Sequence, residues 1–161
     1  MRDKAEQLVG KHADMILRLS YTYLKSTHDA KDICQDVLVK LLTREAPFAN
    51  DEHERAWVVR FTINACKNLL ASATRTRTVA LDEAAAIPAP DEPSGEVWDA
   101  VNELPAEQRE AVYLHYYEGY RIADIAAFTG KSEAAIAKSL SRARAKLRTM
   151  LEGEEYGIHV S

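Results

Sequence analysis

The sequence predicts an all-α protein made of two small helical domains joined by an acidic, proline-containing linker. Strand signals are nearly absent, because β-branched residues are sparse and never alternate with polar residues over a useful length. Apolar residues instead recur every three or four positions in several windows. One stretch, TVALDEAAAIPAPDEPSG, has three prolines and a glycine and no cluster of large apolar residues. We therefore expect a first domain over residues 1–77, a linker over 78–96, a second domain over 97–152 and a tail over 153–161.

The bulk composition is that of a soluble globular protein. The 161 residues carry a formal net charge of -4, and 47% of them are hydrophobic. The acids are concentrated between Thr78 and Gln108, where there is no Lys or Arg. No apolar run approaches the roughly 20 residues needed to span a bilayer, and the first residues lack the apolar segment of a secretory signal. We expect a cytoplasmic protein without membrane insertion.

Motifs for catalysis and metal binding are missing from the sequence. Cys34 and Cys66 are far apart and are expected to be buried thiols, and the histidines have no metal-ligand spacing. There is no Gly-rich phosphate loop and no GxSxG motif. We expect no cofactor, no metal site and no catalytic residue. An enzyme that uses Cys34 with a histidine is the least favoured alternative.

The second half of the chain has the pattern of a helix-turn-helix. A helix is expected from Pro105 to Gly119, and a shorter helix over 121–128. Gly130 is suited to a turn with positive φ, and Ser132 is a good N-cap for the next helix. A short helix, a glycine turn and a longer helix form this motif.

The last helix is strongly basic although the protein is acidic. Ile136, Leu140, Ala143 and Leu147 recur at helical spacing and should face the core. A solvated basic face is one interpretation of the remaining positions. The preceding turn and helix favour a second interpretation, in which the basic helix contacts DNA as a major-groove reader does. The polar and basic positions assigned to this face are Lys138, Ser141, Arg142, Arg144, Lys146 and Arg148.

In the first half, helices are expected over 11–25 and from Ser26 onward, where Ser26 and Asp29 form a capping box. The second helix, DAKDICQDVLVKLL, has an outer stripe that contains three aspartates. This stripe is either an ordinary solvated face or a docking surface for a partner helix, and periodicity does not decide between them.

The third helix, HERAWVVRFTINACKNLLASA, is a second basic segment, because no acid occurs between Arg55 and Leu81. An indole, cations and amides share one polar stripe. Aromatic rings stack on unpaired bases, and Asn can pair with adenine. A core position for the tryptophan is the alternative. The stripe consists of Trp57, Arg60, Asn64, Lys67 and Asn68.

Three ordered segments resemble the extracytoplasmic-function group of bacterial sigma factors. DAKDICQDVLVKLL is similar to the family's D-A-x-D-x-x-Q-[ED]-x-[FL], and AWVVRFTINACKNLL is similar to A-W-L-x-R-I-x-x-N-x-x-x-[DN]-x-L. LPAEQREAVYLHYYEGYRIADIAAFTGKSEAAIAKSLSRARAKL resembles L-P-x-x-x-R…E-G…I-A…G-x-S…[VI]-x-x-x-L-x-R-A-R. The resemblance implies a region-two-like domain, a region-four-like domain and a role in promoter-specific transcription initiation.

The resemblance also implies partners and site residues. The partners are the RNA polymerase core, through the clamp helices of its largest subunit and its flap, then promoter DNA and an anti-sigma protein. Asp29, Asp32, Gln35 and Asp36 would dock on the clamp helices. The minus-ten element would be melted and read by Phe48, Trp57, Arg60, Asn64, Lys67 and Asn68, with Phe48 near an extruded base. The minus-thirty-five element would be read by Arg121, Lys131, Ser132, Glu133, Ala134, Ala137, Lys138, Ser141, Arg142 and Arg144.

Alternatives remain at this stage. A stand-alone helix-turn-helix regulator would need only the second domain, and a helical interaction module would need no DNA contact. The acidic linker either threads the RNA channel of the polymerase or is a solvated tether. The last helix has Ile-Ala-Lys-Ser-Leu over 136–140 where the family often has V-K-S-R-L, so the promoter sequence is not inherited.

Overall fold

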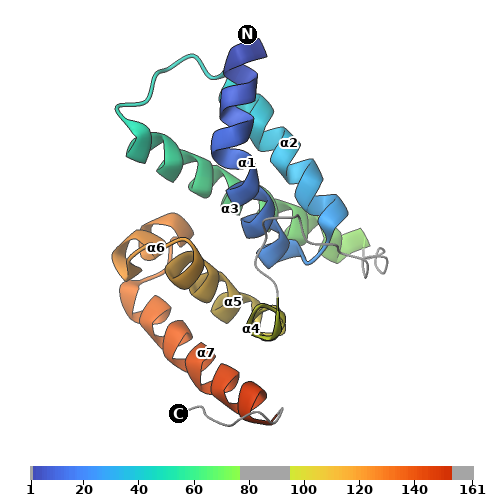
Figure 1. The fold of residues 1–161 in the computed structure, drawn as a ribbon, viewed down its shortest axis with the longest axis vertical. Coiled ribbons are helices and arrows are strands. Elements are labelled where there is room, and N and C mark those ends of the chain that lie inside the picture. Colours follow the sequence, from blue (N-terminus) through green and yellow to red (C-terminus); the bar gives the residue numbers. More distant parts are fainter. Residues whose placement is uncertain (1, 77–94, 154–161) are drawn as a thin grey trace. The chain divides into compact units, whose positions relative to one another are not determined.

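The computed structural model describes residues 2–76 and 95–153, and in these ranges every regular element is a helix (Figure 1). The chain divides into two compact units, Met1–Glu92 and Pro93–Ser161. The predicted all-α class with two helical domains is confirmed. Most of the predicted linker and of the C-terminal tail lies outside the described residues. Within these two ranges, no helix has both the length and the apolar character needed to cross a membrane.

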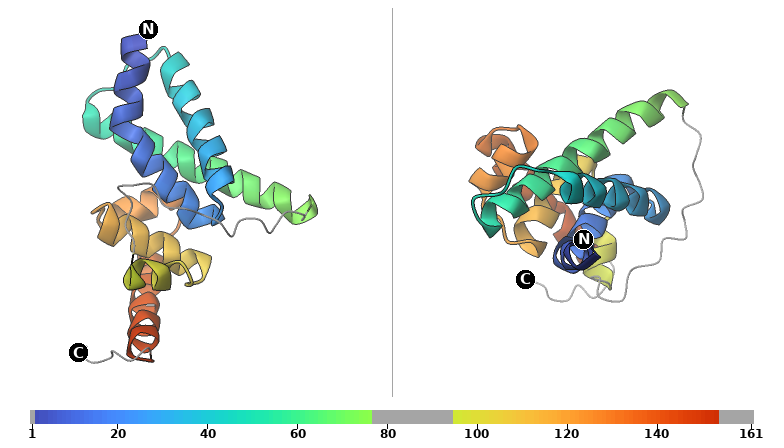
Figure 2. Two further views of the ribbon diagram at one scale, coloured as in Figure 1. Left: turned by 45° about the vertical axis from the view of Figure 1, so that its right-hand side comes forward. Right: turned by 90° about the horizontal axis from the view of Figure 1, so that it is seen from above.

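Over residues 2–76, the first unit contains α1 (Arg2–Leu24), α2 (Thr27–Thr43) and α3 (Asp51–Thr76). Helices α1 and α2 lie side by side, and α3 packs against both of them (Figure 1). The C-terminal part of α3 projects beyond the other two helices (Figure 2). Helix α1 begins well before the predicted start at residue 11. The fully buried side chains at the centre of this unit are Ile16, Leu19, Val37, Val58, Val59, Ile63 and Cys66.

The link between α1 and α2 is tight because both helix ends are capped. Lys25 adopts φ 54, and its N–H donates to the carbonyl of Tyr21 at 2.7 Å, which closes α1 with a left-handed residue. The Ser26 hydroxyl then accepts a hydrogen bond from the Asp29 N–H at 3.1 Å. The Ser26 half of the predicted capping box is therefore confirmed, and it fixes where the aspartate stripe of α2 begins.

A polar network joins α1 to the first turn of α3. The Nε2 atom of His12, which is buried, lies 2.6 Å from Oε2 of Glu54. Lys11 lies 3.2 Å from Asp51 and 3.4 Å from Glu54, and the hydrogen bond to Asp51 raises the pKa of the lysine. These contacts hold the start of α3 in place, immediately after the loop that carries Phe48.

The second unit contains α4 (Glu96–Val101), α5 (Ala106–Val112), a π-helical turn η2 (Tyr113–Tyr117), α6 (Ile122–Thr129) and α7 (Glu133–Gly153). The longest of these, α7, packs against α4, α5 and α6 (Figures 1 and 2). Helix α4 and the π-helical turn were not predicted from the sequence. The core of this unit contains Trp98, Leu104, Tyr113, Leu114, Ile125, Ile136, Leu140 and Ala143.

The turn between α6 and α7 has the predicted chemistry. Gly130 has φ 80, and its N–H donates to the carbonyl of Ala126 at 2.9 Å. The Ser132 hydroxyl accepts a hydrogen bond from the Ala135 N–H at 3.0 Å. The helix-turn-helix formed by α6 and α7 is therefore confirmed.

Candidate polymerase and nucleic-acid interfaces

The aspartate stripe of α2 lies on the surface of the first unit. Asp32, Gln35 and Asp36 are exposed, and Asp29 is half-buried beside the N-cap. Ile33 and Val37 on the opposite face are buried, so the helix packs with its predicted orientation. The stripe is available for contact with a partner.

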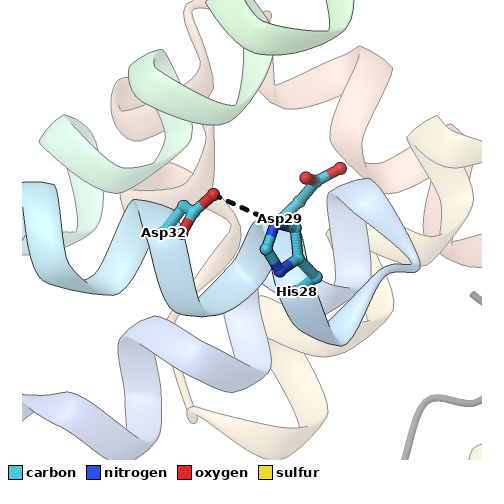
Figure 3. A group of neighbouring side chains, drawn as sticks. All are labelled: His28, Asp29 and Asp32. Carbon is cyan, nitrogen blue, oxygen red and sulfur yellow. Dashed lines mark ion pairs between the residues drawn. The ribbon is translucent and has the colours of Figure 1, made fainter. Parts of the chain in front are cut away.

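A histidine in the first turn of α2 lies beside two of these aspartates (Figure 3). Nε2 of His28 lies 3.6 Å from Oδ2 of Asp32, and one ligand atom each from His28, Asp29 and Asp32 lie within 4.8 Å of one another. His28 and Asp32 are exposed, and exposed acidic groups of this kind are common without a metal ion. His28 offsets part of the negative charge at this end of the stripe when it is protonated.

The predicted nucleic-acid stripe of α3 forms one exposed edge of that helix. Arg60, Asn64 and Asn68 are exposed, and Trp57 and Lys67 are partly exposed. Their spacing of three or four residues places them along one side of a helix with 3.6 residues per turn. The structure thus brings these five side chains together, with the partly exposed indole at one end. The alternative that Trp57 is a core residue fits only in part, because its side chain is partly exposed.

Phe48 packs against the start of this stripe. Its ring centroid lies 5.8 Å from that of Trp57 and 5.2 Å from that of His53, in edge-on arrangements. Trp57 in turn stacks on Phe61 at 4.9 Å with an interplanar angle of 26°. The three rings of Phe48, Trp57 and Phe61 form a continuous aromatic cluster between the loop over 45–50 and α3.

Arg44, the C-cap residue of α2, completes this cluster and was not predicted as a site residue. Its Cζ lies 4.4 Å from the centroid of Phe48 and 5.4 Å from that of Trp57, within the range of cation–π contacts. Its Nε–H donates to the carbonyl of Ala46 at 3.0 Å. A single cation at a helix end is not distinctive in the sequence, so only the fold identifies this residue.

The polar residues of α7 are exposed on the side opposite its buried residues, and some of them border grooves on the two flanks of this exposed side. On one flank, Lys138 and Arg142 line a groove of about 530 Å³ with the start of α5, from Pro105 to Gln108, and with Lys131. On the other flank, Nη1 of Arg144 donates to the Tyr116 hydroxyl at 2.8 Å. Arg142 and Arg144 border different grooves because residues two positions apart on a helix point about 160° away from each other.

The second flank borders a mainly apolar groove of about 420 Å³. Its walls come from α4, from the end of α5 and η2, and from α7. Val97 and Tyr116 in this groove are 51% and 54% exposed, so they add apolar surface to it. The groove residues are Val97, Val101, Val112, Tyr116, Tyr117, Arg144, Leu147 and Arg148.

The remaining predicted minus-thirty-five residues have different environments. Ser132, Glu133, Ala134, Ala137 and Ser141 are exposed at the turn and along α7. Arg121 is the N-cap residue of α6, and its Nε lies 3.7 Å from Asp124. Lys131 lies 2.8 Å from the buried carboxylate of Glu110 and 4.0 Å from Glu107. Lys131 therefore has a structural partner inside its own unit.

The two cysteines are buried, as the sequence predicts. Burial raises the pKa of both thiols to about 11, with a smaller contribution from Asp14 at Cys34 and an opposing hydrogen bond from Ser20 at Cys66. Thiols with such a raised pKa are poor nucleophiles at neutral pH. This environment does not favour the alternative of a catalytic cysteine at Cys34.

Comparison with known protein families matches both units. Residues 8–76 match the family "Sigma-70 region 2", and residues 94–147 match "Sigma-70, region 4". The chain is 30% identical over 158 residues to the ECF RNA polymerase sigma factor SigM of Mycobacterium tuberculosis, which covers 96% of this chain and 81% of SigM.

Two solved structures share the fold. The sigma factor RpoE from Bartonella quintana, in complex with the anti-sigma factor NepR, has a TM-score of 0.72 at 24% identity over 94% of this chain and 98% of RpoE. CnrH in complex with the cytosolic domain of CnrY has a TM-score of 0.60 at 21% identity over 96% of this chain and 92% of CnrH.

The two helical units and their matched regions define a bacterial transcription initiation factor. The chain belongs to the extracytoplasmic-function family of RNA polymerase sigma factors. Proteins of this family are initiation factors that bind core polymerase and promoter DNA, and they are not enzymes in general. A stand-alone helix-turn-helix regulator is not favoured.

Proposed function

We propose that the two units of this sigma factor divide promoter recognition between them. The region-two-like unit, predicted over 1–77, docks on the clamp helices of the largest polymerase subunit and reads the minus-ten element. The region-four-like unit, predicted over 97–152, reads the minus-thirty-five element. The acidic segment over 78–96 connects them and threads the channel that RNA later occupies. The protein acts in the cytoplasm and without catalytic activity of its own.

The clamp helices bind the α2 stripe of Asp29, Asp32, Gln35 and Asp36 in this proposal. Three of these side chains are exposed, and the stripe stands opposite the buried face of the helix. Charge reversal of Asp32 and Asp36 to Lys should abolish co-elution with core polymerase and leave helicity unchanged. Reversal of Asp3, an exposed acid of α1, is the matched control.

The minus-ten element is read by the α3 stripe together with Phe48. The observation that carries this assignment is the contact of Phe48 with Trp57 at the head of a stripe of exposed cations and amides. Base stacking on aromatic side chains contributes roughly 1 to 3 kcal/mol per base. Phe48 holds a base extruded from the duplex, while Asn64 and Asn68 contact base edges and Arg60 and Lys67 contact phosphates.

The minus-thirty-five element is read by the flank of α7 that carries Lys138 and Arg142, together with the exposed residues Ser132, Ala134, Ala137 and Ser141. The groove between this flank and the start of α5 faces the phosphate backbone. Arg121 and Glu133 lie at the ends of the same motif, at the starts of α6 and α7.

The apolar groove on the other flank of α7 binds the polymerase flap in this proposal. Its support is the exposure of Val97 and Tyr116 and the presence of Arg144 and Arg148 at its rim. Arg142→Glu should then weaken promoter binding with normal polymerase binding. Arg144→Glu should instead weaken the association of the second unit with polymerase. Equal effects of the two reversals on DNA binding would refute the division of the two flanks.

An anti-sigma protein regulates the factor in this proposal. The support is that two chains of the same fold, RpoE and CnrH, were each solved with a second protein, described for RpoE as an anti-sigma factor. Such an inhibitor would cover the α2 stripe and the apolar groove and so exclude polymerase. Proteins captured on the immobilised full chain should lose binding when these two surfaces are substituted.

Reconstitution with core polymerase tests the function as a whole. Two modest DNA contacts fixed on one polymerase raise each other's effective concentration, so free protein should bind promoter DNA poorly and the holoenzyme should bind it well. The measurement is run-off transcription on genomic fragments, followed by mapping of the start sites. Failure to co-elute with core enzyme and to initiate on any template, without inhibitor, would refute the proposal.

A further inference from the structure

The loop that carries Phe48 is held at both ends by specific contacts. At its start, the Nε–H of Arg44 donates to the carbonyl of Ala46 at 3.0 Å. At its end, the Ala49 N–H donates to Nδ1 of His53 at 2.9 Å, and the Asn50 side chain accepts from the His53 N–H at 2.8 Å. Phe48 is the one large apolar residue between these anchors, so the loop presents this ring in a defined position.

Arg44 is the contact that couples this position to α3. Its guanidinium touches the ring of Phe48 and also reaches the ring of Trp57, which belongs to a different element. The two rings meet at 60° in an edge-on arrangement, which is one of the favoured geometries of an aromatic pair. A planar cation that contacts both rings restricts the ring of Phe48 relative to the recognition stripe.

We infer that Arg44 is a positioning residue for base capture, which holds the Phe48 ring at Trp57 so that an extruded minus-ten base can stack. The inference rests on the proposed reading of the minus-ten element by the first unit. Arg44 acts through the aromatic ring and not through the phosphate backbone. The contribution of Arg44 is therefore specific to the promoter position at which Phe48 contacts a base.

The first step of the test locates this position. The template is a promoter mapped for this protein with core polymerase, with the minus-ten segment pre-melted and each base of the non-template strand replaced in turn by an abasic site. The captured position is the one at which Phe48→Ala no longer lowers open-complex formation relative to wild type. If no position shows this loss, base capture by Phe48 is wrong and the inference falls with it.

The second step tests Arg44 at that position. Arg44→Gln should lower open-complex formation about 3- to 5-fold on the intact template, the size of one exposed cation–π contact. On the template that is abasic at the captured position, Arg44→Gln should equal wild type. Equal losses on both templates would overturn the inference, because they would indicate a direct phosphate contact or a general structural defect. No loss on either template would overturn it as well.

Control variants separate charge from geometry. Lys4→Gln removes one exposed cation from α1 and should initiate like wild type on both templates. Arg44→Lys keeps the charge but not the planar guanidinium, so it should restore less than half of the loss. Full rescue by Lys would overturn the positioning role. Thermal midpoints and co-elution with core polymerase should be unchanged for all variants, and a failure to initiate by wild type itself would instead refute the proposed function.

Discussion

The ion pair between Lys131 and Glu110 makes the sharpest prediction about stability. It joins the turn of the helix-turn-helix to α5, across 21 positions of sequence. The Glu110 side chain is 2% exposed and that of Lys131 is 27% exposed, with 2.8 Å between Nζ and Oε2. Lys131→Met removes the lysine cation, so the buried carboxylate of Glu110 loses this ion pair.

The expected loss is a large fraction of the stability of the second unit. Breaking a buried ion pair by removing one partner costs roughly 3 to 5 kcal/mol. The lower end, about 3 kcal/mol, applies here because the lysine is partly exposed and water can reach its side of the pair. A domain of this size has a total stability of only about 3 to 10 kcal/mol. The thermal midpoint of the second unit should fall by roughly 12 to 24 °C.

A double variant separates the cost of removing the lysine cation from the value of the pair. In Glu110→Gln with Lys131→Met, both members of this pair are neutral, so most of the lost stability should return. Replacing a buried pair with neutral groups of similar volume is often close to neutral for stability. The control is Lys138→Met, which removes an exposed cation of α7 and should change stability by less than about 0.5 kcal/mol.

Urea denaturation followed by tryptophan fluorescence measures these effects unit by unit. Trp98 is buried in the second unit and Trp57 lies in the first, so a Trp57→Phe background reports the second unit alone. A loss below 1 kcal/mol for Lys131→Met would refute the reasoning. So would a double variant as unstable as the single one. Either result would return Lys131 to the set of predicted DNA contacts with no structural role.

Three further perturbations have defined outcomes. The pKa of Cys34 and of Cys66 is raised to about 11, against 9.0 for an ordinary thiol. A disulfide reagent at pH 8 should therefore label these thiols about 100-fold more slowly in the folded protein than in urea. Equal labelling rates would contradict their burial. The same shifts contribute stability that is fully present below pH 9 and is lost as pH rises toward 11, so urea midpoints should fall over that window. Gly130→Ala should lower the free energy of unfolding by about 1 to 2 kcal/mol, because Gly130 has φ 80, a left-handed conformation that disfavours a side chain. The cost is conformational and not steric, since no atom lies within 4 Å of the added methyl group. An unchanged urea midpoint would contradict this. Ser26→Ala should cost about 1 kcal/mol through loss of the α2 cap, and Ser26→Thr should retain the stability.

The parts of the fold that were predictable depend on local chemistry. Ser26, Gly130 and Ser132 each act on a backbone group within four residues, so their roles follow from the sequence alone. The helical period likewise identifies the buried faces of α2 and α7. The π-helical turn η2 follows no local signal that was recognised, and its Tyr113 and Tyr117 pack on Trp98, which lies far from them in the sequence. The pair of Lys131 with Glu110 is equally invisible before the chain is folded.

The candidate site was predictable in outline and not in detail. The α3 stripe follows from helical spacing, and its members do share one edge of the helix. The contact of Arg44 with Phe48 and Trp57 depends on how the loop after α2 folds back, which no pattern in the sequence encodes. The division of Arg142 and Arg144 between two flanks depends on where α4 and η2 pack against α7.

The charges of the second unit show why a count of cations overstates its affinity for DNA. Lys131 is paired with Glu110, Arg121 lies near Asp124, and Arg144 is bonded to Tyr116 at the apolar groove. Since phosphate binding scales with the number of cations that displace counterions, each cation held elsewhere weakens the grip of this unit on a duplex. A factor with two DNA-binding units requires that each unit alone binds DNA weakly. Tight binding by one unit would keep the factor on DNA without polymerase. In the proposed function, the helix that carries the most positive charge would therefore recognise a promoter only when polymerase brings it there.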